Sequence, residues 1–265
     1  MKSTYLWILA LVITLAAVYY TRTTGPTKPV KGKVEIAGQT IEYRLIRTFS
    51  KPMNAPVKIT VSDQSIGGFF RYKRTPSHDE WTEAPLIREG DQLIAYLPQL
   101  PAAGKTAYQI TLTSQNEKAT LTAEPIVLRF RNDVPAWAMI PHILFMFAAI
   151  FLSARAGLAG IFSQKTYGLT LATLIVLVAG GLIFGPIVQK YAFGDFWTGW
   201  PFGTDLTDNK TAVMFIFWLI AYFRVRKNPN NRWWVLAATL VTFIAYLIPH
   251  SLMGSEIDFT QEIPK

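Results

Sequence analysis

Long apolar runs alternate with polar stretches along this chain and divide it into a membrane part and a soluble part. Runs with almost no charge cover residues 5–20, 135–152, 167–188, 211–225 and 233–248. Their lengths lie in or near the range of a helix that crosses a bilayer. We therefore expect five membrane-spanning helices, the last four of them forming an α-helical bundle over residues 135–250.

The first run leaves two interpretations open. Residues 5–20 follow a single lysine, Lys2, and are short enough to be the core of a cleaved signal peptide. However, no small-x-small cleavage pattern follows, and Tyr19 and Tyr20 suit the aromatic belt at a membrane surface. We expect residues 1–21 to be an uncleaved N-terminal membrane anchor.

Between the first two apolar runs, the hydrophobic pattern changes to a period of two, which is typical of half-buried strands. Turn signals such as Ala37-Gly38 and Glu89-Gly90-Asp91 separate the strands. Many short strands in such a segment indicate an antiparallel all-β sandwich, which we expect over residues 28–132, inserted after the first span. The expected strands are 33–36, 41–48, 57–61, 68–73, 93–96, 107–113 and 126–130.

The segment PAAGKTAYQITLTS (101–114) resembles the late strands of fibronectin type III and immunoglobulin-like modules. In both, a turn of small residues leads into a strand that carries a tyrosine. The resemblance implies a module that binds partners or acts as a spacer, and fold alone does not choose between these roles.

The charged residues of the short loops predict the orientation in the membrane. Among the charged residues of the stretches 190–210 and 251–265, acidic ones predominate, whereas the charged residues of the loops on the opposite side are all basic. Because positive loops remain in the cytoplasm, we expect a multi-pass protein of a bacterial inner membrane with a cytoplasmic N-terminus. The β-sandwich, the loop 191–210 and an acidic tail at 251–265 would then be periplasmic. The basic residues of the cytoplasmic side are Lys2, Arg155, Lys165, Arg224, Arg226, Lys227 and Arg232.

The net charge of +9 arises from an ordinary, mildly basic surface and from these loops. No block of basic residues is interleaved with aromatic ones, so we expect no nucleic-acid partner. The sequence contains no cysteine, which excludes disulfides, cysteine-ligated zinc, iron–sulfur clusters and covalently attached c-type haem.

The stretch YAFGDFWTGWPFGTDLTDNK (191–210), termed the aromatic loop, is unusual for a connection between two membrane helices. It is rich in aromatic residues and glycine, contains three aspartates and ends in a lysine. We expect it to form a structured cap on the outer face of the bundle. Thr207 and Asp208 are suitable N-cap residues for the next helix, and Asp205, Asp208 and Lys210 can neutralise one another.

Two of the three histidines lie in the same tripeptide at the outer ends of two spans: Ile140-Pro141-His142 and Ile248-Pro249-His250. An ionisable side chain at this depth is a candidate functional residue because its burial requires a partner. Neutral imidazoles are good axial ligands of haem iron. The alternative is that both histidines are interfacial caps that bond to a carbonyl or an aspartate. His78, in TPSHDEW, reads as an exposed loop residue.

The segment FGDFWTGW (193–200), followed by DLT (205–207), resembles the tryptophan-rich outer loop of haem-handling membrane proteins in cytochrome c maturation. The sequence departs from that pattern at Phe193, which replaces the first tryptophan, and at Pro201. The resemblance implies a haem b between His142 and His250, the ligands of the iron. The other cofactor-binding residues would be Phe193, Trp197, Trp200 and Asp205.

These observations support one leading function and several alternatives. The leading hypothesis is an outer-face b-type haem site used for electron transfer or haem handling. The main alternative is a cofactor-free accessory or scaffold subunit that docks membrane or periplasmic proteins through the aromatic loop and the β-sandwich. A quinone pocket, a metal site of His142, His250 and an aspartate, or simple interfacial belt roles for Trp197 and Trp200 remain open. Motifs of hydrolases and transferases are absent, and we expect a complex subunit or a homo-oligomer rather than a stand-alone enzyme.

Overall fold

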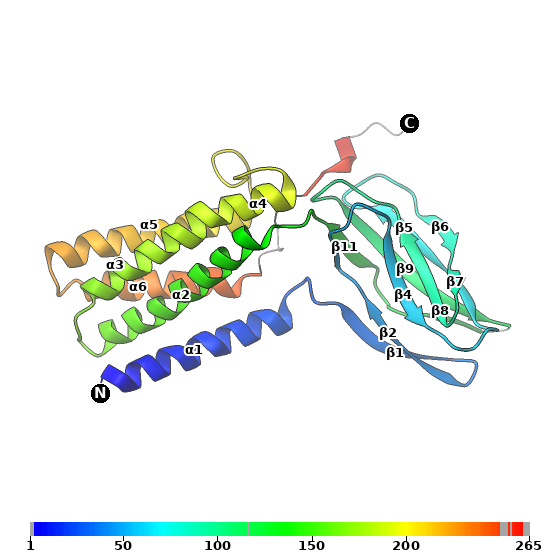
Figure 1. Ribbon diagram of the computed structural model, residues 1–265, viewed down its shortest axis with the longest axis horizontal. Coiled ribbons are helices and arrows are strands. Elements are labelled where there is room, and N and C mark those ends of the chain that lie inside the picture. Colours follow the sequence, from blue (N-terminus) through cyan, green and yellow to red (C-terminus); the bar gives the residue numbers. More distant parts are fainter. Residues whose placement is uncertain (1–2, 116, 250–253, 255, 262–265) are drawn as a thin grey trace. The chain divides into compact units, whose positions relative to one another are not determined.

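The computed structural model describes residues 3–115, 117–249, 254 and 256–261 of the 265-residue chain. These residues form two compact units, coloured along the chain in Figure 1. The helical unit takes its described residues from the ranges Met1–Pro26 and Val134–Ser255. The β unit takes them from Thr27–Asp133 and Glu256–Lys265.

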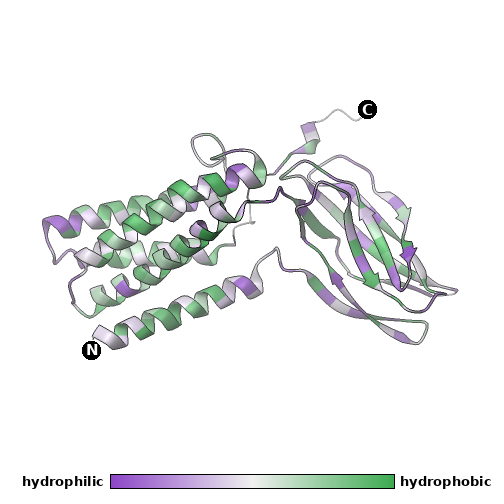
Figure 2. Cartoon of the chain, in the orientation of Figure 1, coloured by the Kyte–Doolittle hydropathy of each residue, from purple (hydrophilic) through white to green (hydrophobic). Residues whose placement is uncertain are grey.

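Helices occupy all five apolar runs of the sequence, and green, the hydrophobic colour, predominates along them in Figure 2. Within the described residues, three of these helices are long and apolar enough to cross a membrane, namely α1, α2 and the continuous helix Tyr167–Phe193. The bounds are α1 (Ser3–Thr24), α2 (Ala136–Ile161), α3 (Tyr167–Leu177), the π-helical η1 (Val178–Phe184), α4 (Gly185–Phe193), α5 (Leu206–Lys227) and α6 (Arg232–Leu247). The segments α3, η1 and α4 follow one another without a break.

Two glycines in η1 allow close contact with neighbouring helices. A Cβ atom on Gly180 would lie 2.8 Å from Cβ of Phe145 in α2, and one on Gly181 would lie 2.8 Å from a methyl group of Thr211 in α5. Small residues at such positions let helix backbones approach closely in a bundle. Gly180 makes the closer approach to α2, and Gly181 makes the approach to α5.

Arg155 corrects one expectation of the sequence analysis. We expected it in a cytoplasmic loop at 153–166, but the small and apolar residues after it continue α2 to Ile161. Arg155 is consequently a buried helical residue. Its guanidinium donates hydrogen bonds to Ser3 Oγ (3.0 Å) and Gln164 Oε1 (2.9 Å), and it lies 5.1 Å from the ring centre of Trp7.

The strands of the β unit form three sheets. The largest has the order β3-β11-β9-β5-β6, with β10 also paired to β9. The order β4-β8-β7 makes the second sheet, and β1 and β2 pair as a hairpin. The bounds are β1 (Val30–Ile36), β2 (Gln39–Leu45), β3 (Thr48–Phe49), β4 (Ala55–Thr60), β5 (Gly67–Arg74), β6 (Thr82–Pro85), β7 (Ile87–Glu89), β8 (Gln92–Leu97), β9 (Lys105–Ser114), β10 (Glu117–Thr120) and β11 (Ile126–Phe130).

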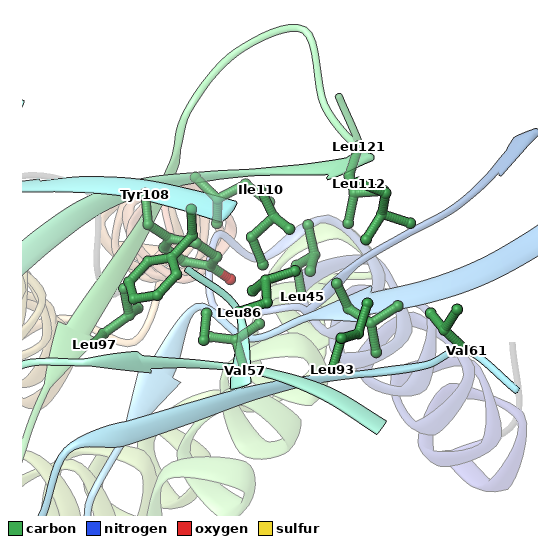
Figure 3. Close-up of a cluster of buried hydrophobic side chains, with 14 of the residues drawn as sticks. Leu45, Val57, Val61, Leu86, Leu93, Leu97, Tyr108, Ile110, Leu112 and Leu121 are labelled. Atoms are coloured by element: carbon green, nitrogen blue, oxygen red, sulfur yellow. The ribbon is translucent and has the colours of Figure 1, made fainter. Parts of the chain in front are cut away.

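Side chains from all three sheets meet in one hydrophobic core (Figure 3). The alternation of buried and more exposed residues is regular in β4 and β11, as the period of two predicts. β9 is instead almost continuously buried, because it lies between β5 and β11 in the largest sheet. At the centre of β9, Tyr108 is fully buried and donates a hydrogen bond to Ile46 O (2.7 Å). Its burial raises the pKa of the phenol far above the ordinary value.

All seven expected strands are present, with bounds that shift by a few residues. The tight turn at Ala37-Gly38 is also present, and both residues have positive φ, as a two-residue hairpin of this twist requires. The sequence analysis missed β3, β6, β7 and β10. Each is two to four residues long, too short for a period of two to be visible.

Candidate functional site

The aromatic loop connects α4 to α5 in the helical unit. Helix α4 ends at Gly194, which has φ of 101° and donates its backbone N–H to Lys190 O (2.9 Å). Glycine takes this left-handed conformation without steric cost, and the chain can then turn away from the helix axis.

The first turn of α5 holds the loop in place. The carboxylate of Asp208, only 5% exposed, accepts hydrogen bonds at Oδ2 from the backbone N–H groups of Thr198 (2.6 Å) and Gly199 (3.0 Å). The same oxygen accepts a third bond from Gln189 Nε2 in α4 (3.0 Å). One buried carboxylate thus joins the loop to the two helices that flank it. Charge-assisted bonds of this kind are stronger than those between neutral groups.

Neighbouring polar side chains extend this network. Asn209 Oδ1 accepts the N–H of Trp200 (2.7 Å), and the N–H of Asp205 donates to Thr198 O (3.0 Å). Asp205 is the N-cap of α5, since its side chain accepts a bond from the N–H of Thr207 (2.7 Å). The expectation that Thr207 or Asp208 is the cap is therefore wrong, because the helix begins earlier than the apolar run suggests, at Leu206.

Two glycines are required by the close packing of the loop. A Cβ atom on Gly199 would lie 2.6 Å from Cβ of Asp208, and one on Gly203 would lie 2.4 Å from Thr198 O. Real Cβ contacts are essentially never this short. The N–H groups of Phe202 and Gly203 both donate to Gly199 O at 2.9 Å, which closes the turn. The loop is thus a compact, internally bonded structure.

The aromatic residues of the loop divide into those that support it and those that it presents. Trp197 is half-buried, and its indole N–H donates to Trp200 O (3.1 Å). Phe193 is half-buried at the end of α4. By contrast, Trp200 is 77% exposed and Phe202 is 82% exposed. Together with the exposed Pro201 between them, they are termed the loop tip.

His142 lies on α2 beside the π-helical segment. Its Nδ1 atom is 2.9 Å from Gly180 O, a distance at which a protonated Nδ1 donates to the carbonyl. Since the imidazole is half-buried, this bond gives it a partner inside the bundle. The second expected ligand, His250, lies outside the described residues.

A cavity of about 20 Å³ lies within the helical unit. Its lining comes from α2, α3, α5 and α6 and includes the buried Lys210, which donates from Nζ to Ile248 O (2.6 Å). Cofactor pockets are typically several hundred Å³, so this cavity does not accommodate a porphyrin. Among the described residues, no group of three or more His, Cys, Asp and Glu side chains is arranged to hold a metal ion.

The site residues expected from the sequence are thus placed in two groups. The loop brings together Phe193, Trp197, Trp200 and Asp205, whereas His142 bonds to η1. Reasoning from sequence missed the roles of Asp208 and Asn209 as acceptors of loop N–H groups, and those of Gly199 and Gly203. The one available signal was the placement of two polar residues directly before an apolar run and after a glycine-rich stretch.

No protein-family model matches this sequence, and a search of curated proteins finds no match either.

Proposed function

We propose that this chain is an accessory subunit of a membrane complex and that the aromatic loop is the surface by which it docks a partner protein. The observation that carries the proposal is the construction of the loop: a buried carboxylate and two obligatory glycines hold Trp200 and Phe202 outward. A fixed loop loses little conformational entropy when it binds, and exposed tryptophans are frequent anchors of protein interfaces.

In the proposed arrangement, all five helices span a bacterial inner membrane. Exposed aromatic residues near the ends of the helices support a membrane setting, because Trp and Tyr favour the two interfaces of a bilayer. Helix α6 is short, and α5 has charged residues at both ends. In the proposed arrangement these two helices cross the membrane packed against the other helices of the bundle and not as isolated spans. The basic loops would be cytoplasmic, and the β unit, as an immunoglobulin-like sandwich, would be periplasmic.

An interfacial belt is the simpler role for Trp200 and Phe202, but it does not account for the network below them. A belt residue needs only a helix end at the correct depth, as at Trp233 and Trp234 at the start of α6. The loop tip instead depends on specific acceptors, Asp208 and Asn209. A loop tip that is held in one conformation is suited to bind a partner protein with a complementary surface.

Co-purification from native membranes tests this proposal. The double change Trp200→Ala and Phe202→Ala should reduce the recovery of a partner protein at least tenfold, while the helical unit keeps its thermal stability. The matched control is Trp233→Ala, which removes an exposed tryptophan elsewhere in the helical unit and should leave recovery unchanged. Equal losses in both variants would show that the aromatic residues act through the bilayer, and would overturn the proposal.

A second candidate function is a b-type haem site with His142 and His250 as ligands, used for electron transfer or haem handling. The observation in its favour is the bond between His142 Nδ1 and Gly180 O, since metal-binding histidines commonly donate their other ring nitrogen to a carbonyl. Nε2 would then be the ligand atom. The test is a reduced-minus-oxidised visible spectrum of purified protein expressed with ample haem. Sharp α and β bands that disappear in His142→Ala would support this candidate, and a featureless spectrum would exclude it.

A further inference from the structure

The C-terminal segment 256–261 belongs to the β unit rather than to the helices that precede it in the chain. It contains a short 3-10 helix, η2 (Phe259–Gln261). Phe259 is only 5% exposed, and its backbone N–H donates to Pro76 O (3.0 Å). An aromatic ring near the end of the chain is therefore packed into a recess of the β unit.

Arg74, the last residue of β5, and the loop after it build this recess. The guanidinium of Arg74 donates from Nε and Nη2 to both oxygens of Asp79 (2.7 and 3.0 Å). With the guanidinium held in this way, Cζ of Arg74 lies 4.6 Å from the ring centre of Phe259. Ser77 Oγ donates to Arg74 O (2.7 Å) and accepts the N–H of Asp79 (3.1 Å). The hydrogen bonds from Arg74 also keep the pKa of Asp79 below its ordinary value.

Charge complementarity accompanies the ring contact. Lys105, at the start of β9, forms an ion pair with Glu256. Asp258 is exposed, and its pKa is lowered first by hydrogen bonds from Thr260 and more weakly by the nearby His78. Two basic side chains, Arg74 and Lys105, thus contact the segment, which presents an acid three residues before an aromatic ring.

Among the described residues, the contacts that hold the resident segment include one buried ring, one backbone hydrogen bond and one ion pair, whose Glu256 side chain is well exposed. Exposed ion pairs contribute little to stability, and ordering the segment costs conformational entropy for each residue. The covalent connection adds to these contacts, because it keeps the segment at a high local concentration beside the recess.

We propose that this recess is a binding site for a segment of a partner protein that carries an acidic residue three positions before an aromatic one. The chain's own segment 256–261 occupies the site and competes with the partner. The aromatic ring of the partner would take the place of the Phe259 ring on the guanidinium of Arg74, and Lys105 selects the acid. This inference is independent of the aromatic loop, because it concerns the β unit alone.

Binding of a fluorescent peptide to the full chain in detergent tests the proposal. The probe is the sequence of residues 254–261, GSEIDFTQ. Phe259→Ala removes the resident ring and should bind the probe at least tenfold more tightly than the unchanged chain does. Thr260→Ala, which leaves the ring in place, is the matched control and should behave as the unchanged chain. A probe with alanine in place of its phenylalanine should lose binding at least tenfold.

Two further variants keep the test decisive. Adding Arg74→Ala to Phe259→Ala should abolish the gain in affinity, and a chain that ends at Gly254 should bind the probe as Phe259→Ala does. Equal affinity of the probe for the unchanged chain and for Phe259→Ala would overturn the proposal. If the unchanged chain is a dimer and the Phe259→Ala variant is a monomer, the proposal is also overturned. Two copies of the chain would then exchange their C-terminal segments.

Discussion

At the scale of single residues, Asp208 is the main acceptor for the aromatic loop, because its Oδ2 atom accepts four hydrogen bonds, from Gln189 Nε2, from the N–H and hydroxyl of Thr198, and from the N–H of Gly199. Asp208→Ala leaves the N–H groups of Thr198 and Gly199 without their acceptor, which costs about 1–3 kcal/mol. We therefore expect hydrogen exchange at these two amides to become at least tenfold faster. Asp195→Ala, an exposed acid of the same loop, is the control. Unchanged exchange in Asp208→Ala would mean that the loop is ordered by other contacts.

The ion pair of Asp79 with Arg74 predicts a pH dependence in the β unit. The pKa of Asp79 is lowered in the folded state, so the pair contributes its full stabilisation above the usual pKa of an aspartate, about 4. The contribution is lost as the pH falls through the lowered pKa of the folded state. Asp79→Asn should therefore be less stable than the unchanged chain at neutral pH and approach it in acid.

Chemical denaturation of the β unit at a series of pH values measures this difference. A constant gap between the two proteins from neutral pH into the acid range would show that the carboxylate does not stabilise the fold through its charge. The same experiment followed by the fluorescence of a label near residue 261 would report the release of the C-terminal segment.

At the scale of elements, the loop turn depends on the absence of a side chain at Gly203. A methyl group there would lie 2.4 Å from Thr198 O, so the backbone must move. Overpacking of this kind usually costs about 1–3 kcal/mol. We expect Gly203→Ala to increase protease cleavage within the loop several-fold, whereas Thr204→Ala, at an exposed neighbouring position, should not. Equal cleavage of both variants would contradict the described turn.

The close contact between α2 and η1 can be tested by comparing alanine substitutions at a packed glycine and at an open one. Gly180→Ala places a methyl group 2.8 Å from Cβ of Phe145 and should lower stability by about 1–3 kcal/mol. Gly168→Ala, in the open first turn of α3, has nothing within 4 Å of the added atom and should be neutral or stabilising by up to about 1 kcal/mol. In detergent, Gly180→Ala should therefore melt at a lower temperature than the unchanged chain, and Gly168→Ala at the same or a higher temperature. Similar values would argue against close packing at Gly180.

The elements themselves were largely predictable from the sequence, because their hydrophobic patterns are long. The five apolar runs all became helices, and the period of two located seven strands. Ends of elements were less predictable, since they depend on tertiary contacts. Helix α2 continues beyond Arg155 to Ile161, and the buried guanidinium donates to Ser3 and Gln164, which lie 152 and 9 positions away in the sequence.

At the scale of the whole molecule, the sequence identified the aromatic loop as a structured element but not what its residues do. Composition cannot show that Asp208 and Asn209 turn back to bond the loop, because those bonds join residues about ten positions apart in a non-periodic segment. For the same reason, the docking of Phe259 beside Arg74 could not be inferred. The proposed haem ligation by His142 and His250 stays a prediction, since His250 lies outside the described residues.

Cross-linking from the loop tip shows which molecule this surface contacts in the membrane. A photoreactive amino acid replaces Phe202 in native membranes, with Ile175, an exposed position on α3, as the control site. We expect position 202 to form an adduct with one protein other than this chain. The adduct should be lost when Gly203→Ala is added and kept with Thr204→Ala. Adducts at position 202 that contain only lipid, as at position 175, would show that the loop tip faces the bilayer and docks no partner.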